Sequence, residues 1–493
     1  MKLKYLNIDC GREPMVFLNA NSPIVKKEGF IALNRVAISD KNETVYATLS
    51  IMEENDLLKD DELGISKSVF NKITNKNSDF EIKHMDEPAS FTYVRKKLRG
   101  VPFTEESIFE VIKEVVEGKY TDMHMACLCS ATEGENLTDD EIAYLAKAMT
   151  GTGETIDWGN KDIIVDKHCI GGIPGNRTTI IAIPIVAEFG LTIPKTSSSA
   201  ITSASGTAEV MNVFTEVDIK TEDMKKIVED VNGCVVWGGG VDLNPSDDII
   251  IKVKKDLNLD SRGQMLASII SKKVAAGSNC ILIDVPYGKT AKTKTYETAL
   301  GLKNDFENLG KKLGVKVFVN ISDGSQPVGR GVGPALEAQD VLNVLENKTE
   351  GLEDLKEKAI KLSGIILEFS PNVKKGEGEK IAREILESGR ALKRFKMICE
   401  AQGGLKEIPV AKYTHDILAD KDGTLVEIDN KAFAGIAKLA GSPLKPAAGV
   451  YLHKHLNEQI KKGDKLYTIH SDSEGELEVA IKTAKNSEIF IIK

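Results

Sequence analysis

The stretch from Val165 to Thr179 reads VDKHCIGGIPGNRTT, and its pattern is the most informative about the fold. An apolar run precedes it, three glycines interrupt it, and a second apolar run follows it from Ile180 to Phe189. This order predicts a strand, a glycine-rich turn and a helix beginning near Arg177, as in parallel sheets covered by helices. Glycines bring backbone N–H groups close to an anion, and a helix N-terminus adds a favourable dipole. The stretch therefore predicts an anion site as well as a fold.

A plain turn with solvated charges is the alternative interpretation of this stretch. Lys167, His168 and Arg177 lie within it together with Thr178 and Thr179, and this density of donors favours an anion site. The pattern is neither a Walker A loop, which ends in Gly-Lys-Ser/Thr, nor a Gly-x-Gly-x-x-Gly fingerprint. A nucleoside triphosphatase and a dehydrogenase are therefore disfavoured.

A second polar segment follows, with seven hydroxyl residues between Ser197 and Thr207. Hydroxyl groups donate and accept hydrogen bonds, so they suit both phosphate oxygens and ribose hydroxyls. A flexible surface loop is an even alternative. Helical residues resume at Ala208, so Thr207 also suits a helix N-cap.

Outward from these segments, near-continuous apolar runs alternate with helical sequence, which is typical of a parallel sheet covered on both faces. The predicted strands are Ile163–Val165, Cys234–Trp237, Cys280–Val285 and Val315–Val319. The predicted fold class is α/β, with a mixed and largely parallel sheet. The predicted domains are a β-rich N-terminal domain at 1–86, a helical lobe at 87–160 plus 245–276, an α/β phosphate-binding lobe at 161–244 plus 277–405, and an α+β C-terminal domain at 406–493.

The sequence of the predicted helical lobe contains residues typical of helix N-caps. Thr104 is a plausible N-cap, followed by apolar residues on one helix face. Thr138 and Glu141 have the spacing of a capping box. A further helix is predicted from Ser261 to Ala276.

Composition indicates an ordinary globular protein. The chain has 493 residues, 41% of them hydrophobic and 28% charged. Its apolar runs are shorter than a bilayer-spanning helix and its start lacks the apolar stretch of a secretion signal, so we expect a cytoplasmic protein without a membrane partner. A net charge of −9 disfavours nucleic-acid binding but not an anionic small substrate.

Seven scattered cysteines lack zinc-ligand spacing, and His453 and His455 have no further candidate ligands nearby. We therefore expect reduced thiols, no metal site and no cofactor. The loop from Ser322 to Gly333 follows a predicted strand, and both a site-lining role and plain turn chemistry fit it.

The two polar segments resemble those of the pyrimidine/thymidine phosphorylase family. Lys167–Thr179 and Lys195–Ser203 are most similar to blocks of the archaeal AMP phosphorylases. The similarity extends through Leu137–Glu141, Leu266–Lys273, Ala291–Thr295, Gly449–Val450 and Gly463–Asp464, and it includes an extra N-terminal domain.

The resemblance implies a pentosyltransferase of nucleotide degradation. It would split AMP, and also CMP and UMP, with inorganic phosphate into ribose 1,5-bisphosphate and free base. Phosphate is then the nucleophile, so no side-chain nucleophile is expected. The implied phosphate-binding residues are Lys167, Thr178, Ser197 and Thr207. The implied nucleotide-binding residues are Gly171, Gly172, Ser198, Ser199, Ala200, Ile201, Thr202, Ser203, Thr207, Ser268 and Lys292.

The resemblance also places the proton donor at Asp260. Protonation of the departing base eases cleavage of an N-glycosidic bond, provided that burial or a nearby anion raises the pKa of the carboxyl group. Asp260 precedes a predicted helix, so an N-cap is the alternative role.

Two residues bear on substrate choice. Cys169 stands where nucleoside-specific members have Ser and agrees with the AMP-using members. Ser199 stands where both groups usually have Arg, so a bidentate anion donor is missing. The preference between nucleotide and nucleoside is therefore open at this position.

Three rival functions remain. A pyrimidine-nucleoside or thymidine phosphorylase would share the site. A phosphoribosyltransferase would need magnesium ligands, for which Asp247 and Asp248 are a possible pair, although a surface run fits them better. A noncatalytic nucleotide-binding protein is the third. Apolar faces on the lobes and the extra domain favour a homo-oligomer, a dimer or larger.

Overall fold

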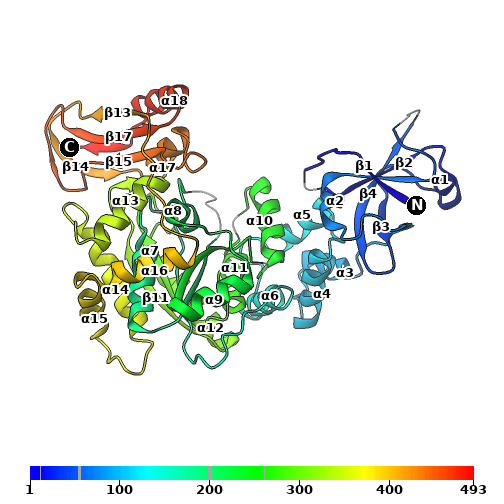
Figure 1. Ribbon diagram of the computed structural model, residues 1–493, viewed down its shortest axis with the longest axis horizontal. Helices are drawn as coiled ribbons and strands as arrows, with labels where there is room; N and C mark the ends of the chain where they lie inside the picture. The colour runs from blue at the N-terminus through cyan, green and yellow to red at the C-terminus, as the bar shows by residue number, and fades with distance from the viewer. Residues whose placement is uncertain (12, 54–56, 198–202, 242, 260) are drawn as a thin grey trace. The chain divides into compact units, whose positions relative to one another are not determined.

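The computed structural model describes residues 1–493 apart from 12, 54–56, 198–202, 242 and 260. The chain forms two compact units (Figure 1). The first comprises Met1–Thr152 with Pro245–Met265, and the second Gly153–Asn244 with Leu266–Lys493. The finer division into four domains stays a prediction.

The N-terminal part of the first unit is a six-stranded mixed sheet in the order β1-β5-β2-β4-β3-β6. Its strands are β1 (Lys2–Tyr5), β2 (Met15–Asn19), β3 (Arg35–Ser39), β4 (Thr44–Met52), β5 (Glu62–Ile65) and β6 (Glu81–His84), with short helices α1 (Pro23–Glu28) and α2 (Lys67–Lys72). Alternating residues such as Val16 and Leu18 are buried. The predicted β-rich region is confirmed.

Helices make up the rest of the first unit. They are α3 (Phe91–Leu98), α4 (Glu105–Val116), α5 (Asp122–Ala131), α6 (Asp139–Gly151), α10 (Pro245–Leu257) and the start of α11 (Arg262–Ala275). Thr138 and Glu141 form the predicted capping box of α6, because each side chain accepts the other's backbone N–H. Thr104 caps α4 as predicted, with Ser107 completing its box.

Parallel strands form the centre of the second unit. They are β7 (Val165–Cys169), β8 (Ile193–Ser197), β9 (Gly233–Trp237), β10 (Cys280–Tyr287) and β11 (Lys316–Asp323). They pair as β11-β10-β7 and as β8-β9, and a parallel bridge from Ile164 to Thr192 joins the two groups. The predicted largely parallel sheet is confirmed. Strand β8 was not predicted, because buried Lys195 and Thr196 interrupt its apolar pattern.

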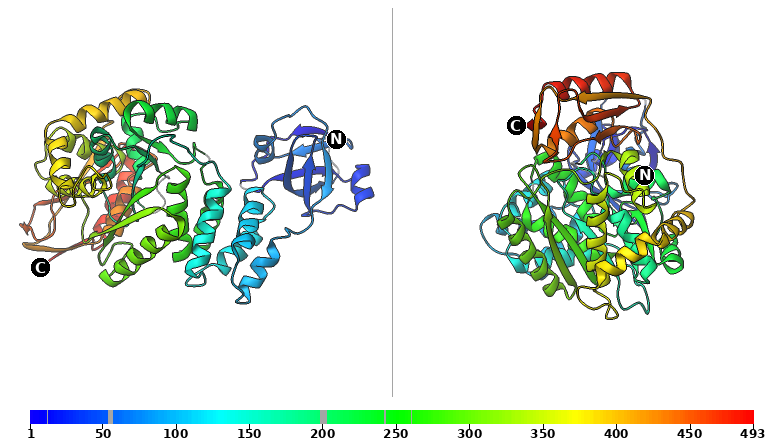
Figure 2. Two further views of the ribbon diagram at one scale, coloured as in Figure 1. Left: turned by 90° about the horizontal axis from the view of Figure 1, so that it is seen from below. Right: turned by 90° about the vertical axis from the view of Figure 1, so that its left-hand side faces the viewer.

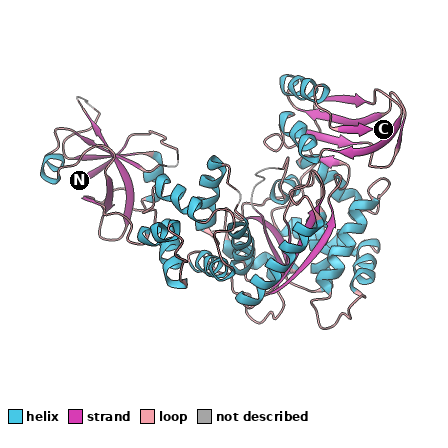
Figure 3. Ribbon diagram, turned by 180° about the vertical axis from the view of Figure 1, so that it is seen from behind, coloured by secondary structure: helices cyan, strands magenta, loops and turns pink. Residues whose placement is uncertain are grey.

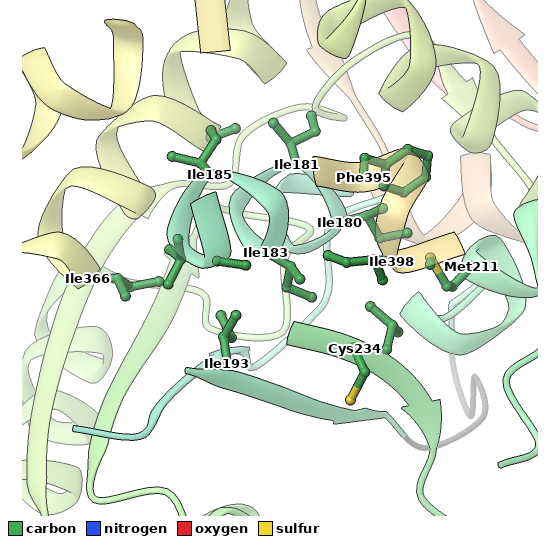
Figure 4. Packing of buried hydrophobic residues seen from close by; sticks show 14 of the residues in the cluster. Ile180, Ile181, Ile183, Ile185, Ile193, Met211, Cys234, Ile366, Phe395 and Ile398 are labelled. Carbon is green, nitrogen blue, oxygen red and sulfur yellow. The ribbon is translucent and has the colours of Figure 1, made fainter. Parts of the chain in front are cut away.

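Helices flank these strands (Figure 2). They are α7 (Thr178–Phe189), α8 (Thr207–Phe214), α9 (Thr221–Val231), α12 (Tyr296–Leu313), α13 (Pro334–Leu345), α14 (Glu353–Leu367), α15 (Gly378–Glu387) and α16 (Arg390–Ala401). Residues on all sides of α7 are buried from Thr178 to Ala187. Figure 4 shows its isoleucines among Ile193, Cys234, Ile366 and Phe395. A helix that is apolar all round belongs in a core, so α7 is a fixed support for the turn before it.

The C-terminal part of the second unit is antiparallel (Figure 3). Its strands are β12 (Gly331–Val332), β13 (Tyr413–Leu418), β14 (Gly423–Ile428), β15 (Gly449–Leu452), β16 (Gln459–Ile460), β17 (Lys465–Ser471) and β18 (Phe490–Ile492). Helices α17 (Asn430–Leu439) and α18 (Glu474–Lys485) complete the predicted α+β region. Across the part of the chain that is described, no helix combines the length and apolarity needed to cross a bilayer.

Candidate active site

The glycine-rich turn connects β7 to α7 in the second unit. Gly171, Gly172 and Gly175 have φ angles of +86°, +87° and +67°, which side-chain-bearing residues rarely adopt. A β-carbon on Gly172 would overlap the backbone nitrogen of Lys292, so the segment at Lys292 packs directly against the turn. Two predicted substrate-binding positions are thereby adjacent.

The loop from 322 to 333 also packs against the turn. A β-carbon on Gly175 would overlap the carbonyl oxygen of Val328, and the backbone N–H of Asn176 donates to that same oxygen at 3.0 Å. The sequence left open whether this loop lines the site or is a plain turn, and the structure shows that it packs against the glycine-rich turn. The close approach of Val328 leaves no room for a side chain at position 175, so glycine is required there.

Lys167 is fully buried in strand β7, just before the turn. Its Nζ donates to Thr178 Oγ1 at 2.8 Å and to Thr179 Oγ1 at 3.0 Å. Burial lowers the pKa of Lys167, while Cys169 and Asp284 oppose that shift. The described hydrogen bonds of this ammonium therefore go to hydroxyls at a helix start, an environment suited to an added anion.

Arg177 connects the turn to the second polar segment. Its Nη1 donates to Thr207 Oγ1 at 3.3 Å and its Nη2 to the carbonyl oxygen of Ser205 at 3.2 Å. Gly206 is the N-cap of α8, so Thr207 is the first helical residue rather than the cap. Thr207, one predicted phosphate ligand, is thus hydrogen-bonded to the residue that directly precedes Thr178, another predicted phosphate ligand.

A buried network lies beside this turn. Asp166 Oδ1 accepts from Lys195 Nζ at 3.1 Å, and Asp166 Oδ2 pairs with Lys273 Nζ at 3.2 Å. Burial lowers the pKa of Lys273 to about 7, with Asp166 opposing and Lys195 assisting that shift. Burial and the surrounding lysines also hold the pKa of His168 well below its usual range, so this imidazole is neutral at pH 7.

A second carboxylate–lysine pair lies next to β7. Asp284 pairs with Lys358 at 3.2 Å and accepts from Asn320 Nδ2 at 2.9 Å, and its register partner on β7 is Cys169. Burial alone would raise the pKa of Asp284, but Lys358 and Lys167 lower it below its usual value. The carboxylate is therefore ionised beside the turn. Burial raises the pKa of the Cys169 thiol.

The remaining predicted site residues are distributed unevenly. Ser197 is the last residue of β8, Ser203 Oγ donates to the carbonyl oxygen of Ser205 at 2.8 Å, and half-buried Ser268 lies on α11. Ser198, Ser199, Ala200, Ile201, Thr202 and Asp260 lie outside the described residues. The roles of all these positions stay predictions.

Candidate metal ligands do not cluster. Among the described residues, no three His, Cys, Asp or Glu side chains are grouped to hold an ion. Asp247 is buried in the first turn of α10 while Asp248 is exposed, so the interpretation of this pair as a surface run was wrong for Asp247. His455 Nδ1 contacts Gln326 Oε1 and His453 Nε2 contacts Thr468 Oγ1.

Three family models match the chain. The helical bundle domain of a glycosyl transferase family matches residues 92–153, and the a/b domain of that family matches residues 161–392. The C-terminal domain of pyrimidine nucleoside phosphorylases matches residues 424–489. The candidate site thus lies in the a/b domain.

Solved structures show the same architecture. Anthranilate phosphoribosyltransferase from Thermus thermophilus superposes with a TM-score of 0.53 at 17% identity, covering 63% of this chain and 98% of that one. The enzyme from Saccharomyces cerevisiae, in complex with PRPP and Mg, has a TM-score of 0.51 at 16% identity, covering 65% and 99%. These likenesses establish the fold alone.

Sequence relatives are far more similar. A protein of Legionella pneumophila (strain Corby) named "Putative thymidine phosphorylase" is 42% identical over 493 residues, which is 100% of this chain and 95% of the relative. A protein of the same name from Hahella chejuensis (strain KCTC 2396) is 42% identical over 480 residues, 97% of this chain and 95% of the relative. The chain belongs to the thymidine/pyrimidine-nucleoside phosphorylase family.

Proposed function

We propose that this protein splits nucleoside 5'-monophosphates, AMP and also CMP and UMP, with inorganic phosphate. The products are ribose 1,5-bisphosphate and the free base. The N-glycosidic bond breaks, a bond forms between C1' and a phosphate oxygen, and the base leaves with a proton. Phosphate is the nucleophile, so the protein supplies positioning and charge stabilisation.

One observation carries the proposal of a phosphate site. The buried ammonium of Lys167 donates hydrogen bonds to the hydroxyl groups of two threonines at the N-terminus of α7. A phosphate here would gain a full positive charge, helix-terminal N–H groups and hydroxyl donors together. Its charge would also offset the energetic cost of the buried ammonium. We assign phosphate binding to Lys167, Thr178, Ser197 and Thr207.

Neutral His168 and the lysines around it add to the same environment. Lys195 and Lys273 share the single carboxylate of Asp166, so this network has a positive excess when Lys273 is protonated. An excess of buried positive charge favours binding of an anionic substrate. It also stabilises the negative charge of the attacking phosphate in the transition state. Asp260 is proposed as the acid that protonates the departing base.

One feature favours a nucleotide over a nucleoside: Cys169 agrees with the AMP-using members of the family. We assign nucleotide contacts to Gly171, Gly172, Ser198–Ser203, Thr207, Ser268 and Lys292.

Thymidine or pyrimidine-nucleoside phosphorolysis is the second candidate, because the curated relatives carry that name. The departure at Ser199, where the family usually has Arg, also leaves this candidate open. It would use the same phosphate site and leaving-group chemistry on a substrate that lacks the 5'-phosphate; thymidine also lacks the 2'-hydroxyl group and carries a different base.

The test is an assay of base release by the purified protein. AMP, CMP, UMP and thymidine are each incubated with phosphate, and in parallel with pyrophosphate and magnesium. We expect free base from the monophosphates only when phosphate is present. Base release from thymidine alone would favour the second candidate. Base release only with pyrophosphate and magnesium would instead indicate a phosphoribosyltransferase.

A further inference from the structure

Glu337 on α13 is a buried carboxylate that joins three segments of the second unit. Its Oε2 accepts from Arg177 Nε, and its Oε1 accepts from Ser205 Oγ and, at 3.0 Å, from the backbone N–H of Gly333. The side chain is only 2% exposed. Arg177 and Ser205 both lie far from Glu337 in the sequence, so this carboxylate is a long-range link.

The partners of Glu337 are themselves next to proposed phosphate ligands. Arg177 precedes Thr178 and donates to Thr207 Oγ1 at 3.3 Å. Ser205 lies two residues before Thr207. The carboxylate is therefore bonded to both polar segments, one bearing Lys167 and Thr178 and the other bearing Thr207.

We propose that Glu337 is a positioning residue for phosphate: it holds Arg177 and the segment at Ser205 in the arrangement that lets Thr178 and Thr207 bind one phosphate. This inference rests on the proposed function, because it concerns the same anion site. A buried ion pair contributes little net stability compared with a well-packed apolar core, but it fixes geometry, and breaking it leaves an uncompensated charge. Loss of Glu337 should therefore affect phosphate before it affects the nucleotide.

Asp340 provides a matched control on the same helix. It is also buried, and its Oδ2 accepts the backbone N–H groups of Arg330 and Gly331 at 2.7 Å each. Asp340→Asn keeps an acceptor oxygen for both amides. Glu337→Gln keeps an acceptor for Ser205 and Gly333 but turns an amide N–H₂ toward Arg177, so it removes the ion pair alone.

The first experiment is a calorimetric titration of inorganic phosphate into the full-length protein and both variants. We expect Glu337→Gln to weaken phosphate binding by about tenfold or more, since hydrogen bonds to charged groups are worth that much. Asp340→Asn should bind phosphate within about twofold of wild type, because the described hydrogen bonds of Asp340 go to Arg330 and Gly331 and not to either polar segment. Equal phosphate affinity in wild type and Glu337→Gln overturns the proposal.

Steady-state kinetics separates positioning from general damage. For Glu337→Gln the KM for phosphate should rise more than the KM for AMP, because Glu337 positions both Thr178 and Thr207 and only Thr207 is also assigned to the nucleotide. The double variant with Arg177→Met should be no worse than Arg177→Met alone. Additive losses, or equal rises in both KM values, contradict a role through Arg177. If Glu337→Gln does not fold, Ser205→Ala tests the same link, with an expected rise in the phosphate KM and a contrary result if that KM is unchanged.

The two hypotheses fail in different ways. If wild-type protein binds phosphate but Glu337→Gln binds it equally well, the positioning role is wrong and the proposed function stands. If wild-type protein neither binds phosphate nor releases base in its presence, the proposed function fails and the positioning role fails with it.

Discussion

At the scale of single residues, the ammonium of Lys167 is central to the proposed phosphate site. It is buried, its described hydrogen bonds go to hydroxyls, and burial lowers its pKa. Burying a charge without a hydrogen-bonded counter-charge costs the free protein stability. Because a bound anion would offset that cost, the arrangement has the energetics of a preformed anion site.

Lys167→Met tests that interpretation. It removes the charge but keeps an unbranched apolar side chain in the core. The KM for phosphate should rise by about tenfold to a hundredfold, which is the range for a hydrogen bond to a charged group. Initial rates at varied phosphate give this KM, and the KM for AMP serves as the internal control. An unchanged phosphate KM would remove Lys167 from the site.

Asp260→Asn tests the proposed acid. An amide cannot protonate the departing base, so kcat should fall by about a hundredfold or more, the usual contribution of a general acid. The midpoint of thermal unfolding should change little. A lowered midpoint with a normal kcat would indicate a helix cap instead.

Residues close in sequence were predictable, and distant partners were not. Lys167 and Thr178 lie eleven residues apart in one motif, and the resemblance of that motif to the family predicts both as phosphate ligands. Lys195 and Lys273 reach Asp166 from other elements, and Glu337 reaches Arg177 across 160 positions. A lone buried carboxylate or lysine has no periodic signal, so only the folded chain reveals these pairings. Asp247 is a further example. Two adjacent aspartates, Asp247 and Asp248, suggest an exposed position, yet Asp247 is buried in the folded chain.

At the scale of elements, the turn between β7 and α7 works only if its neighbours can approach it. Gly172 and Gly171 share the same backbone conformation, with φ angles of +87° and +86°, yet only Gly172 is in contact with Lys292. Substitutions at both glycines should strain the backbone, whereas only a substitution at Gly172 should also clash with Lys292.

Gly172→Ala should displace the Lys292 segment as well as strain the turn. We expect its KM for AMP to rise by about tenfold or more, whereas Gly171→Ala should show mainly a strain cost of about 1 kcal/mol in the free energy of unfolding. Denaturant titrations and initial rates measure both. Identical effects of the two substitutions would mean that contact with Lys292 does not matter.

Asp340 on helix α13 should make the stability of the protein depend on pH. Burial, with help from Glu337 and Asp354, raises the pKa of Asp340 to about 7. Between the ordinary pKa of 3.8 and 7, the folded protein retains a proton that the unfolded chain has released. Stability from this group is therefore present at low pH and lost as pH rises toward 7.

Asp340→Asn removes that titration because its side chain is always neutral. The difference in unfolding midpoint, variant minus wild type, should become more positive between pH 5 and pH 8. Calorimetric scans at several pH values give this difference. A difference that does not vary with pH would show that Asp340 is ionised throughout the range.

Element prediction succeeded where patterns are strong. Continuous apolar runs revealed β9 and β10, and capping residues revealed α4 and α6. Strand β8 was missed because its buried lysine pairs with Asp166, so tertiary contact replaces the apolar pattern that marks a strand. The strand that was not predicted, β8, is the one that ends at Ser197, where the second polar segment begins.

At the scale of the whole molecule, the alternation of apolar runs and helical sequence predicts the fold class, and the resemblance of the two polar motifs points to the family. The family models and the 42% identical relatives agree on a nucleoside phosphorylase. The roles proposed for these motifs, binding of phosphate and cleavage of the glycosidic bond, are common to nucleotide- and nucleoside-splitting members. The 5' substituent of the substrate is therefore the point that sequence leaves open, at Cys169 and Ser199.

The most direct test compares AMP with adenosine, which differ only in the 5'-phosphate, and adds thymidine as the alternative substrate. The measurement is kcat/KM for base release at saturating phosphate. We predict that kcat/KM for AMP exceeds that for adenosine and thymidine by about a hundredfold or more, because a site built to bind a polar group rejects analogues that lack it. A kcat/KM for thymidine or adenosine equal to or above that for AMP would contradict the proposed specificity for nucleoside monophosphates.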